Sequence, residues 1–217
     1  MIKTSISILD CDFNNLEYEI NRVNNSNSDL IHIDIMDGKF VPNNTLEKFD
    51  MNKISKYSDK NFDVHLMVEN PIDYISSFVT PLTDYISIHL ESKGIDQSLK
   101  SIKENGIKCG LAINPDTKIQ KLYPFLEIID MVIIMSVFPG KGGQKFIENT
   151  YDKVETLRNH DKNIDISVDG GVSSSNSKTL ISKGASTLVS GSYLMKSNNI
   201  NNSCLLYTSD AADEYSG

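Results

Sequence analysis

The sequence predicts an α/β protein of the (β/α)8 barrel class, and three patterns lead to this expectation. Short runs rich in β-branched residues alternate with longer segments of helical period, as in strand–helix units around a parallel sheet. We count eight such runs in the 217 residues, whereas an open doubly wound sheet more often has about five or six strands. The first run is not followed by the Gly-x-Gly-x-x-Gly fingerprint of that open sheet. Together these patterns favour a closed TIM barrel.

The predicted strands and helices alternate along the whole chain. The strands are expected to end near Leu9, Ile35, Met67, Leu90, Ile113, Ser136, Asp169 and Ser190. The segments between them leave room for one crossover helix each. Helical period extends over residues 14–24, 71–79, 95–105, 146–159 and 174–183.

One domain is expected over residues 1–197, because a chain of this length suffices for a single large core. After Met195 the sequence lacks the apolar i, i+3, i+4 stripe of a packing helix, so the last helix of the barrel is not recognisable. Residues 198–217 are interpreted as an atypical tail, disordered or non-native. From Cys204 onward the sequence looks like translated cloning sequence, and we exclude it from the fold prediction.

Composition excludes several classes of protein. A net charge of −8 and a pI near 5.0 argue against a nucleic-acid-binding protein, which needs clustered Lys and Arg. No apolar run approaches the roughly 18 residues of a membrane span, and no export signal is visible at the amino terminus. The three cysteines form no Cys-x-x-Cys pair. We therefore expect a cytoplasmic protein without nucleic-acid or membrane partners.

The second predicted strand carries two ionisable side chains on one face. His32 and Asp34 are two residues apart, so their side chains point to the same side, whereas Ile31, Ile33 and Ile35 point to the other. Ionisable groups inside a barrel are costly unless they are paired or bind a metal ion. Taken alone, the two residues fit a buried His–Asp pair as well as a metal site.

Further polar residues lie at the ends of three other predicted strands, where barrel enzymes place their chemistry. His65 lies near the end of the third strand, His89 and Glu91 near the end of the fourth, and Asp169 at the end of the seventh. Two imidazoles and two carboxylates would suit a divalent ion such as Zn, Fe(II), Mn or Co. The candidate ligands are His32, Asp34, His65 and Asp169. His89 and Glu91 are expected to support these ligands rather than to bind the ion.

Glycine-rich loops follow the sixth, seventh and eighth predicted strands, at residues 138–144, 169–171 and 190–192. Exposed backbone N–H groups in such loops can bind a phosphate. Each glycine pair alone could be an ordinary tight turn, but three neighbouring loops favour a phosphorylated small molecule. Met36, Met67 and Met135 end strands two, three and six, where they either line the site or fill the core.

These residues resemble the D-ribulose-5-phosphate 3-epimerase family from about Ser5 to Met195. The resemblance is carried by residues 7–9, 31–43, 64–68, 112–115 and 134–146, of which the second and the last are the most specific. It implies a barrel of the ribulose-phosphate-binding type, a phosphorylated ketopentose substrate, one divalent metal ion per chain and a homo-oligomer. It also implies the interconversion of D-ribulose 5-phosphate and D-xylulose 5-phosphate by two-base proton transfer through an enediolate.

The resemblance also assigns roles to single positions. It implies that the four candidate ligands bind the metal and that Asp34 and Asp169 also exchange protons with the substrate. The implied substrate contacts are Ser7, His65, Met36, Met67, Met135, Gly142, Gly143, Gly171, Gly191 and Ser192. The sequence departs from the family pattern at Asp10, Cys11, Lys39 and Lys141. We expect these departures to alter loop packing and substrate affinity.

In a ring of eight, strands two and seven are three steps apart, so Asp34 and Asp169 are expected to reach opposite faces of a sugar.

Alternative functions remain open at this point. An epimerase of a six-carbon ketose phosphate, such as allulose 6-phosphate, would use the same chemistry. A related decarboxylase or aldolase would be expected to place a Lys among the carboxylates, where this chain has Met36. A non-catalytic phosphosugar-binding barrel and a truncated inactive chain are the remaining alternatives.

Overall fold

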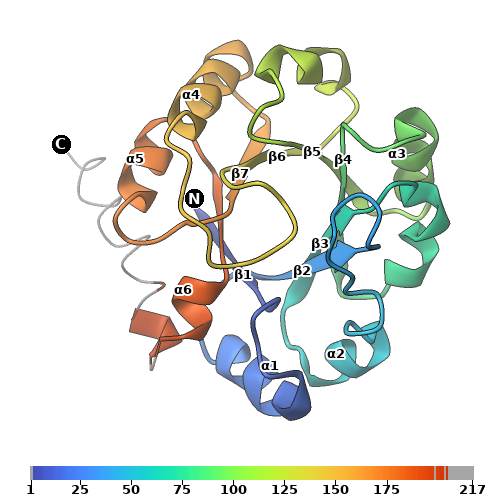
Figure 1. Cartoon of the computed structure of the whole chain (residues 1–217), viewed down its shortest axis with the longest axis vertical. Helices are drawn as coiled ribbons and strands as arrows, with labels where there is room; N and C mark the ends of the chain where they lie inside the picture. Colours follow the sequence, from blue (N-terminus) through green and yellow to red (C-terminus); the bar gives the residue numbers. More distant parts are fainter. Residues whose placement is uncertain (1, 198, 203, 205–217) are drawn as a thin grey trace.

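The computed structural model describes residues 2–197, 199–202 and 204, and its strands close into one parallel barrel. Neighbours around the ring follow chain order, and the last strand pairs with the first (Figure 1). The predicted (β/α)8 TIM barrel is confirmed, and the strands end within two residues of the predicted positions. The strands are β1 (Lys3–Ser7), β2 (Leu30–Met36), β3 (Asn61–Met67), β4 (Thr83–His89), β5 (Lys108–Ile113), β6 (Met131–Met135), β7 (Asp165–Asp169) and β8 (Thr187–Ser190).

Helices surround the ring of strands and cover its outer face (Figure 1). The α-helices are α1 (Leu16–Asn24), α2 (Met51–Tyr57), α3 (Ile95–Glu104), α4 (Thr150–His160), α5 (Ser177–Ser182) and α6 (Ser192–Met195). The 3-10 helices are η1 (Phe13–Asn15), η2 (Pro71–Asp73), η3 (Ile75–Phe78) and η4 (Ile119–Phe125). The helix predicted over residues 71–79 is therefore two 3-10 segments, and α2, η4 and α6 were not predicted.

The two faces of the strands have different environments because side chains alternate along a strand. On β2, Ile31, Ile33 and Ile35 belong to the large apolar core between the strands and the outer helices. A smaller apolar cluster, which includes Leu30 and Tyr85, lies inside the ring. The rest of the interior is polar, in contrast to the branched apolar residues that usually fill such barrels. The buried polar residues on the inward positions include Ser5, His32, Asp63, His65, Ser87, His89 and Ser167.

The described part of the chain after Met195 packs on the barrel. Residues 200–202 are helical, and Ile200 and Cys204 are buried in the outer core. Arg22 of α1 donates hydrogen bonds to the carbonyl oxygens of Met195 and Ser197, 3.0 and 2.9 Å away. This packing contrasts with the expectation of a chain end without a packing helix. The other residues of the predicted 198–217 tail lie outside the described residues.

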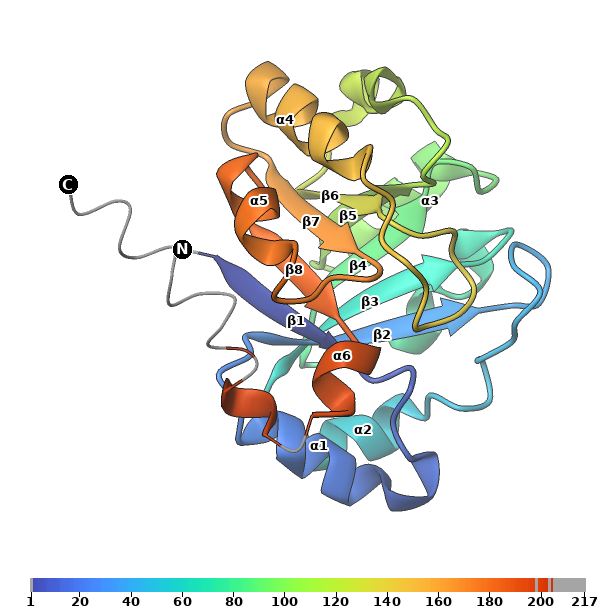
Figure 2. The ribbon, with the colours of Figure 1, turned by 60° about the vertical axis from the view of Figure 1, so that its left-hand side comes forward.

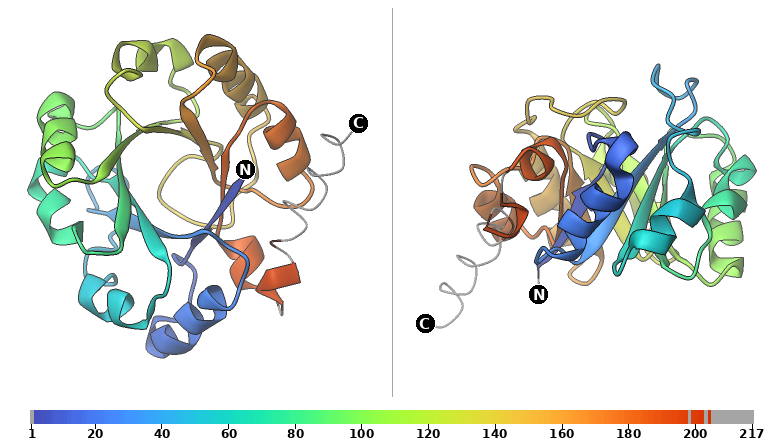
Figure 3. Two further views of the ribbon diagram at one scale, coloured as in Figure 1. Left: turned by 180° about the vertical axis from the view of Figure 1, so that it is seen from behind. Right: turned by 90° about the horizontal axis from the view of Figure 1, so that it is seen from below.

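Long loops follow the carboxyl ends of β2 and β6, and both lie at the same end of the barrel (Figures 2 and 3). The loop between β6 and α4, residues 136–149, crosses the opening of the ring (Figure 1). Polar side chains at the strand ends therefore lie beneath a covering loop. No helix in the described part of the chain combines the length and the apolar character needed to cross a membrane.

Candidate metal and substrate site

Four buried ionisable side chains meet inside the barrel at the carboxyl ends of three strands. β2 supplies two of them, and β3 and β7 supply one each. In the register of the sheet, Asp34 lies opposite His65. Closure of the ring brings β7 to three steps from β2, so Asp169 reaches the same point from another side. The cluster comprises the four predicted ligands, His32, Asp34, His65 and Asp169.

Each member of this His/Asp cluster directs one nitrogen or oxygen at the others. Asp34 Oδ1 lies 3.4 Å from His32 Nε2 and 3.6 Å from His65 Nδ1. Asp169 Oδ2 lies 3.6 Å from His32 Nε2 and 3.4 Å from His65 Nδ1. Ordinary N–H···O hydrogen bonds are shorter, about 2.7–3.2 Å. Both nitrogens are buried and have no hydrogen-bond partner among the described residues, which is costly unless another group binds them.

The cluster fits a divalent metal ion. Ligands about 2.0–2.2 Å from a tetrahedral zinc-class ion lie about 3.3–3.6 Å from one another. The four measured N···O separations, 3.4–3.6 Å, match that spacing. Two imidazoles and two carboxylates form a mixed nitrogen and oxygen donor set that suits Zn, Fe(II), Mn or Co. The two unpartnered imidazole nitrogens are the atoms that such an ion would satisfy.

Asp63 orients the first histidine of the cluster. Its Oδ2 lies 2.8 Å from His32 Nδ1 and accepts a second hydrogen bond, of 3.3 Å, from Ser5 Oγ. Asp63 and His32 are both fully buried. A carboxylate behind a ligating histidine fixes the ring orientation and tautomer. No role was predicted for Asp63 from the sequence, although its place two residues before His65 puts it on the same inward face of β3.

His89 and Glu91 support the second histidine in the same way. His65 Nε2 lies 2.9 Å from His89 Nε2, and His89 Nδ1 lies 3.2 Å from Glu91 Oε2. Glu91 also accepts hydrogen bonds from the backbone of Asn114, at 3.0 Å, and from the hydroxyl of Thr117. Both residues therefore stand behind the cluster rather than within it, as expected. Burial lowers the pKa of His89 to about 4, so its ring is neutral near pH 7 and its Nε2 can accept a hydrogen bond from His65 Nε2–H.

The charges within the cluster stabilise one another in the metal-free protein. Burial alone would raise the pKa of Asp34, but the charge of His32 and contacts with both histidines hold it well below its usual range. The pKa of Asp169 is lowered by the same two histidines against the effect of burial. Burial alone would lower the pKa of His32, but Asp63 and Asp34 raise it well above 6.5. Asp169 and Asp34 likewise raise the pKa of His65.

Ser7 holds the second oxygen of Asp34. Its hydroxyl donates a 2.6 Å hydrogen bond to Asp34 Oδ2, while Asp34 Oδ1 faces the cluster. The two oxygens of this carboxylate therefore have different partners. Such a bond to a charged group both orients it and favours its ionised form.

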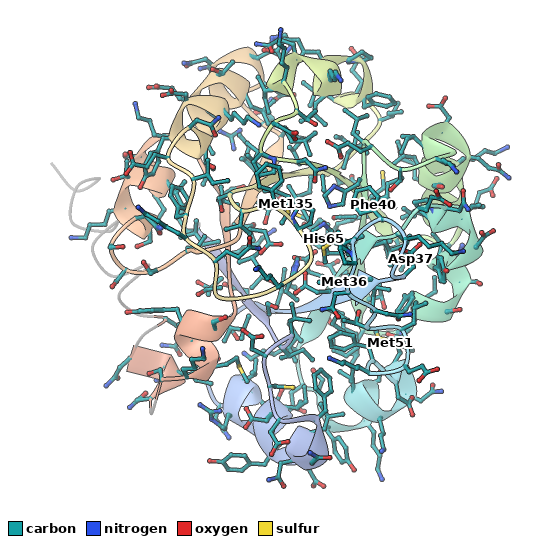
Figure 4. The ribbon with its side chains drawn as sticks, viewed as in Figure 1. Met36, Asp37, Phe40, Met51, His65 and Met135 are labelled. Atoms are coloured by element: carbon teal, nitrogen blue, oxygen red, sulfur yellow. The ribbon has the colours of Figure 1, made fainter. Side chains whose placement is uncertain are left out.

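A cavity of about 250 Å³ opens directly above the cluster. Asp34 and Asp169 line it, whereas His32 and His65 do not, because both are fully buried beneath it. His65 thus faces the carboxylates and has no surface in the cavity, so its expected contact with substrate stays a prediction. Met36 and Met135 lie toward the middle of the barrel near His65 in Figure 4, while Met51 lies out at α2. The other predicted contacts in the cavity wall are Ser7, Met36, Met67, Met135, Gly142, Gly143, Gly171, Gly191 and Ser192.

The three glycine-rich loops converge on one side of this cavity. A Cβ atom at Gly143 would lie 3.7 Å from Ser192 Oγ, so the loops after β6 and β8 are in contact. A Cβ atom at Gly171 would lie only 2.9 Å from the backbone nitrogen of Phe146, which leaves no room for a side chain after β7. Gly143 and Gly171 also have positive φ angles, 70° and 62°, that favour glycine.

Two of the four departures from the family pattern lie in the cavity wall. Asp10 and Lys141 both line the cavity. Cys11 is half-buried and packs against the outer core, and Lys39 is exposed in the loop after β2. Of these four residues, only Asp10 and Lys141 therefore contribute ionisable side chains to the cavity wall.

Fold and site together define a (β/α)8-barrel enzyme whose polar residues gather at the carboxyl ends of the strands. A family model described as the ribulose-phosphate 3 epimerase family matches residues 3–195. The chain is 39% identical to the ribulose-phosphate 3-epimerase of Bacillus subtilis over 198 residues, which cover 88% of this chain and 91% of that protein. It is 37% identical to the chloroplastic ribulose-5-phosphate-3-epimerase of Arabidopsis thaliana, with 88% and 70% of the two chains covered. The chain belongs to the ribulose-phosphate 3-epimerase family.

Solved structures of other enzymes share the barrel. KGPDC from Streptococcus mutans matches with a TM-score of 0.74 at 13% identity, covering 100% of this chain and 99% of that one. The 3-hexulose-6-phosphate synthase of Salmonella typhimurium matches with a TM-score of 0.72 at 16% identity, covering 98% and 99%. At these identities the likeness concerns the fold alone.

Proposed function

We propose that the chain interconverts D-ribulose 5-phosphate and D-xylulose 5-phosphate as a metal-dependent, two-base epimerase. The observation that carries this proposal is the placement of Asp34 and Asp169. Both carboxylates line one cavity, and both face the same two histidine nitrogens. Inversion of a carbon beside a ketone requires the removal of a proton on one face and the return of a proton on the other. Two acid–base groups must therefore flank the substrate.

The origin of the two carboxylates suits this task. Asp34 comes from β2 and Asp169 from β7, three steps apart around the ring. A flat enediolate between them would present one face to each carboxylate. One carboxylate would remove the C3 proton, and the other, in its acid form, would return a proton from the opposite side. Because both pKa values are lowered in the metal-free protein, the carboxylate that returns a proton would first take it from water, and the carboxylate that removed the C3 proton would release it to water afterwards.

The His/Asp cluster would hold one divalent ion, with Zn, Fe(II), Mn and Co as the candidates. When bound, such an ion supplies positive charge beside the oxygens that become negative as the proton leaves, which lowers the barrier by several kcal/mol. Asp63, His89 and Glu91 would keep the two histidines in the ligating orientation. Ser7 would keep Asp34 Oδ1 directed at the cluster.

The rest of the cavity would position the substrate. We assign the phosphate of the ketopentose to the side formed by Gly142, Gly143, Gly171, Gly191 and Ser192. Binding energy from this remote group would orient C3 between the carboxylates. Met36, Met67 and Met135 would exclude water from the reacting centre. A homo-oligomeric state and a cytoplasmic location stay proposals from the sequence.

The proposal is tested by an assay of ribulose 5-phosphate conversion together with metal analysis of the purified protein. We expect about one divalent ion per chain and a higher kcat/KM for ribulose 5-phosphate than for allulose 6-phosphate. Asp169→Asn should abolish epimerisation and leave the circular dichroism spectrum unchanged, because the amide cannot exchange the proton. Full turnover by this variant, or by protein stripped of metal, would refute the assignment.

A further inference from the structure

Asp10 lies on the phosphate side of the cavity and adds a negative charge there. It follows β1, whereas Gly142 and Gly143 come from the loop after β6 and Ser192 begins α6. All four residues line the same cavity. A carboxylate is an unexpected neighbour for residues that we assign to an anionic group.

The contacts of Asp10 place its carboxylate beside Ser192 and Gly142. Ser192 Oγ donates a hydrogen bond to Asp10 Oδ2. The same oxygen lies so close to Gly142 that a Cβ atom at position 142 would overlap it. A Cβ atom at Gly143 would lie 3.7 Å from Ser192 Oγ. The Asp10 carboxylate therefore occupies space next to two of the residues that we assign to the phosphate, Gly142 and Ser192.

Asp10 and a phosphate would compete for the same donor. A hydroxyl group has one hydrogen to donate, and both an ionised carboxylate and the dianion of a sugar phosphate are acceptors only. Ser192 Oγ cannot donate to both at once. The two anions would also repel each other at close range. A substrate phosphate must therefore displace the Asp10 side chain from Ser192 before it can take its place.

We propose that Asp10 is a specificity-determining residue that occupies the phosphate subsite of the free enzyme and lowers its affinity for phosphate groups. This inference rests on the proposed function, because it takes the glycine side of the cavity as the phosphate subsite. The carboxylate acts as an internal competitor. Inorganic phosphate, which lacks the contacts of a sugar, is the ligand that this competition weakens most directly.

The test measures binding of inorganic phosphate to the metal-loaded enzyme and to two variants. Asp10→Asn keeps the shape and removes the charge, and Asp10→Ala removes the side chain. We expect both to bind inorganic phosphate about five- to tenfold more tightly, since both lose the charge repulsion and Asp10→Ala also loses the competing acceptor. The KM for ribulose 5-phosphate should fall in parallel. Adding Ser192→Ala to Asp10→Ala should remove the part of the gain that comes from the freed Ser192 hydroxyl.

Glu127→Gln provides a control with the same change in net charge. Glu127 is exposed and precedes β6, so it lies at the amino-terminal end of the strands, away from the cavity. The affinity of the Glu127→Gln variant for inorganic phosphate should stay within about twofold of that of the wild type, because long-range charge effects are screened. Unchanged or weaker phosphate binding in both Asp10 variants would overturn the proposal, as would an equal gain in Glu127→Gln.

The result is independent of catalysis. Phosphate binding is measured without turnover, so an enzyme that failed to convert ribulose 5-phosphate would refute the proposed function and still report on Asp10. Conversely, an active enzyme whose Asp10 variants bind phosphate no more tightly than the wild type would retain the proposed function and lose this inference.

Discussion

His65 and His89 face each other through their Nε2 atoms, which lie 2.9 Å apart, so a single proton is shared between the two rings. If His65 Nδ1 binds a metal ion, the proton of His65 lies on Nε2 and is donated to His89. His89 then carries its own proton on Nδ1 and donates it to Glu91 Oε2, 3.2 Å away. This arrangement leaves one tautomer for each ring and directs the lone pair of His65 Nδ1 into the cluster.

This relay of hydrogen bonds, from His65 through His89 to Glu91, predicts that His89 controls metal affinity without touching the metal. In His89→Ala, His65 loses the acceptor for its Nε2 proton, and the ligating tautomer is no longer favoured. We expect the dissociation constant for the metal to rise about 10- to 100-fold, as measured by competition with a chelator. His160→Ala is the matched control, because His160 stacks on Tyr123 and lies outside the cluster. Equal metal affinity in His89→Ala and the wild type would contradict the relay.

Removal of the metal should lower the stability of the folded protein by an amount that depends on pH. In the metal-free protein the pKa values of His32 and His65 are raised, because nearby carboxylates oppose the effect of burial. Each raised value contributes stability that is fully present below about pH 6.5, the unfolded value, and is lost as pH rises through the folded value. The lowered pKa values of Asp34 and Asp169 contribute stability above about pH 4 that is lost on acidification.

We therefore expect the melting temperature of the metal-free protein to fall as pH rises above about 6.5, whereas the metal-bound protein keeps its stability. Metal binding displaces the histidine protons, so the apparent metal affinity should also rise over this pH range. Calorimetry of both forms between about pH 6 and 9 measures the two effects. A constant difference in melting temperature across this range would show that the histidines do not exchange protons for metal.

Ser7 is expected to lower the pKa of Asp34 rather than to bind the metal. In Ser7→Ala, Asp34 Oδ2 loses a buried 2.6 Å hydrogen bond, so the pKa of Asp34 should rise. We predict a fall in kcat of about tenfold or more, from the loss of about 1.5–3 kcal/mol of hydrogen bonding to a charged group. The acidic limb of the pH–rate profile should move to higher pH, with metal content unchanged.

Ser167→Ala is the control for Ser7. Ser167 lies inside the barrel on β7, and its buried hydroxyl has no hydrogen-bond partner among the described residues. Its removal should leave the pH–rate profile in place. A similar shift of the acidic limb of the pH–rate profile in both serine variants would mean that any loss of a hydroxyl inside the barrel disturbs catalysis.

The ligand set could be predicted from sequence because local rules determine it. The alternation of side chains puts His32 and Asp34 on one face of β2, and parallel strands collect their carboxyl ends at one edge. Contacts across the barrel could not be predicted in this way. The bond between Asp63 and His32 depends on the register of β2 against β3, and that between Ser192 and Asp10 on closure of β8 against β1.

The missed helices have a similar explanation. α2 has only seven residues and buries Met51 and Ile54 alone, so it carries too little apolar period to be recognised. η4 contains Pro124, which argues against a helix in a sequence-based prediction. The packing of Ile200 and Cys204 depends on a surface formed by other parts of the chain. Short and interrupted helices are thus determined by tertiary contacts more than by local pattern.

The origin of the hydrogen at C3 of the product tests the central claim most directly. Ribulose 5-phosphate is converted in D2O, and the first xylulose 5-phosphate formed is analysed by NMR or mass spectrometry. If Asp34 and Asp169 act from opposite faces, the proton removed by one cannot be returned by the other, and the product carries solvent deuterium at C3. Product that retains the original hydrogen at C3 would require a single acid–base group and would contradict the account.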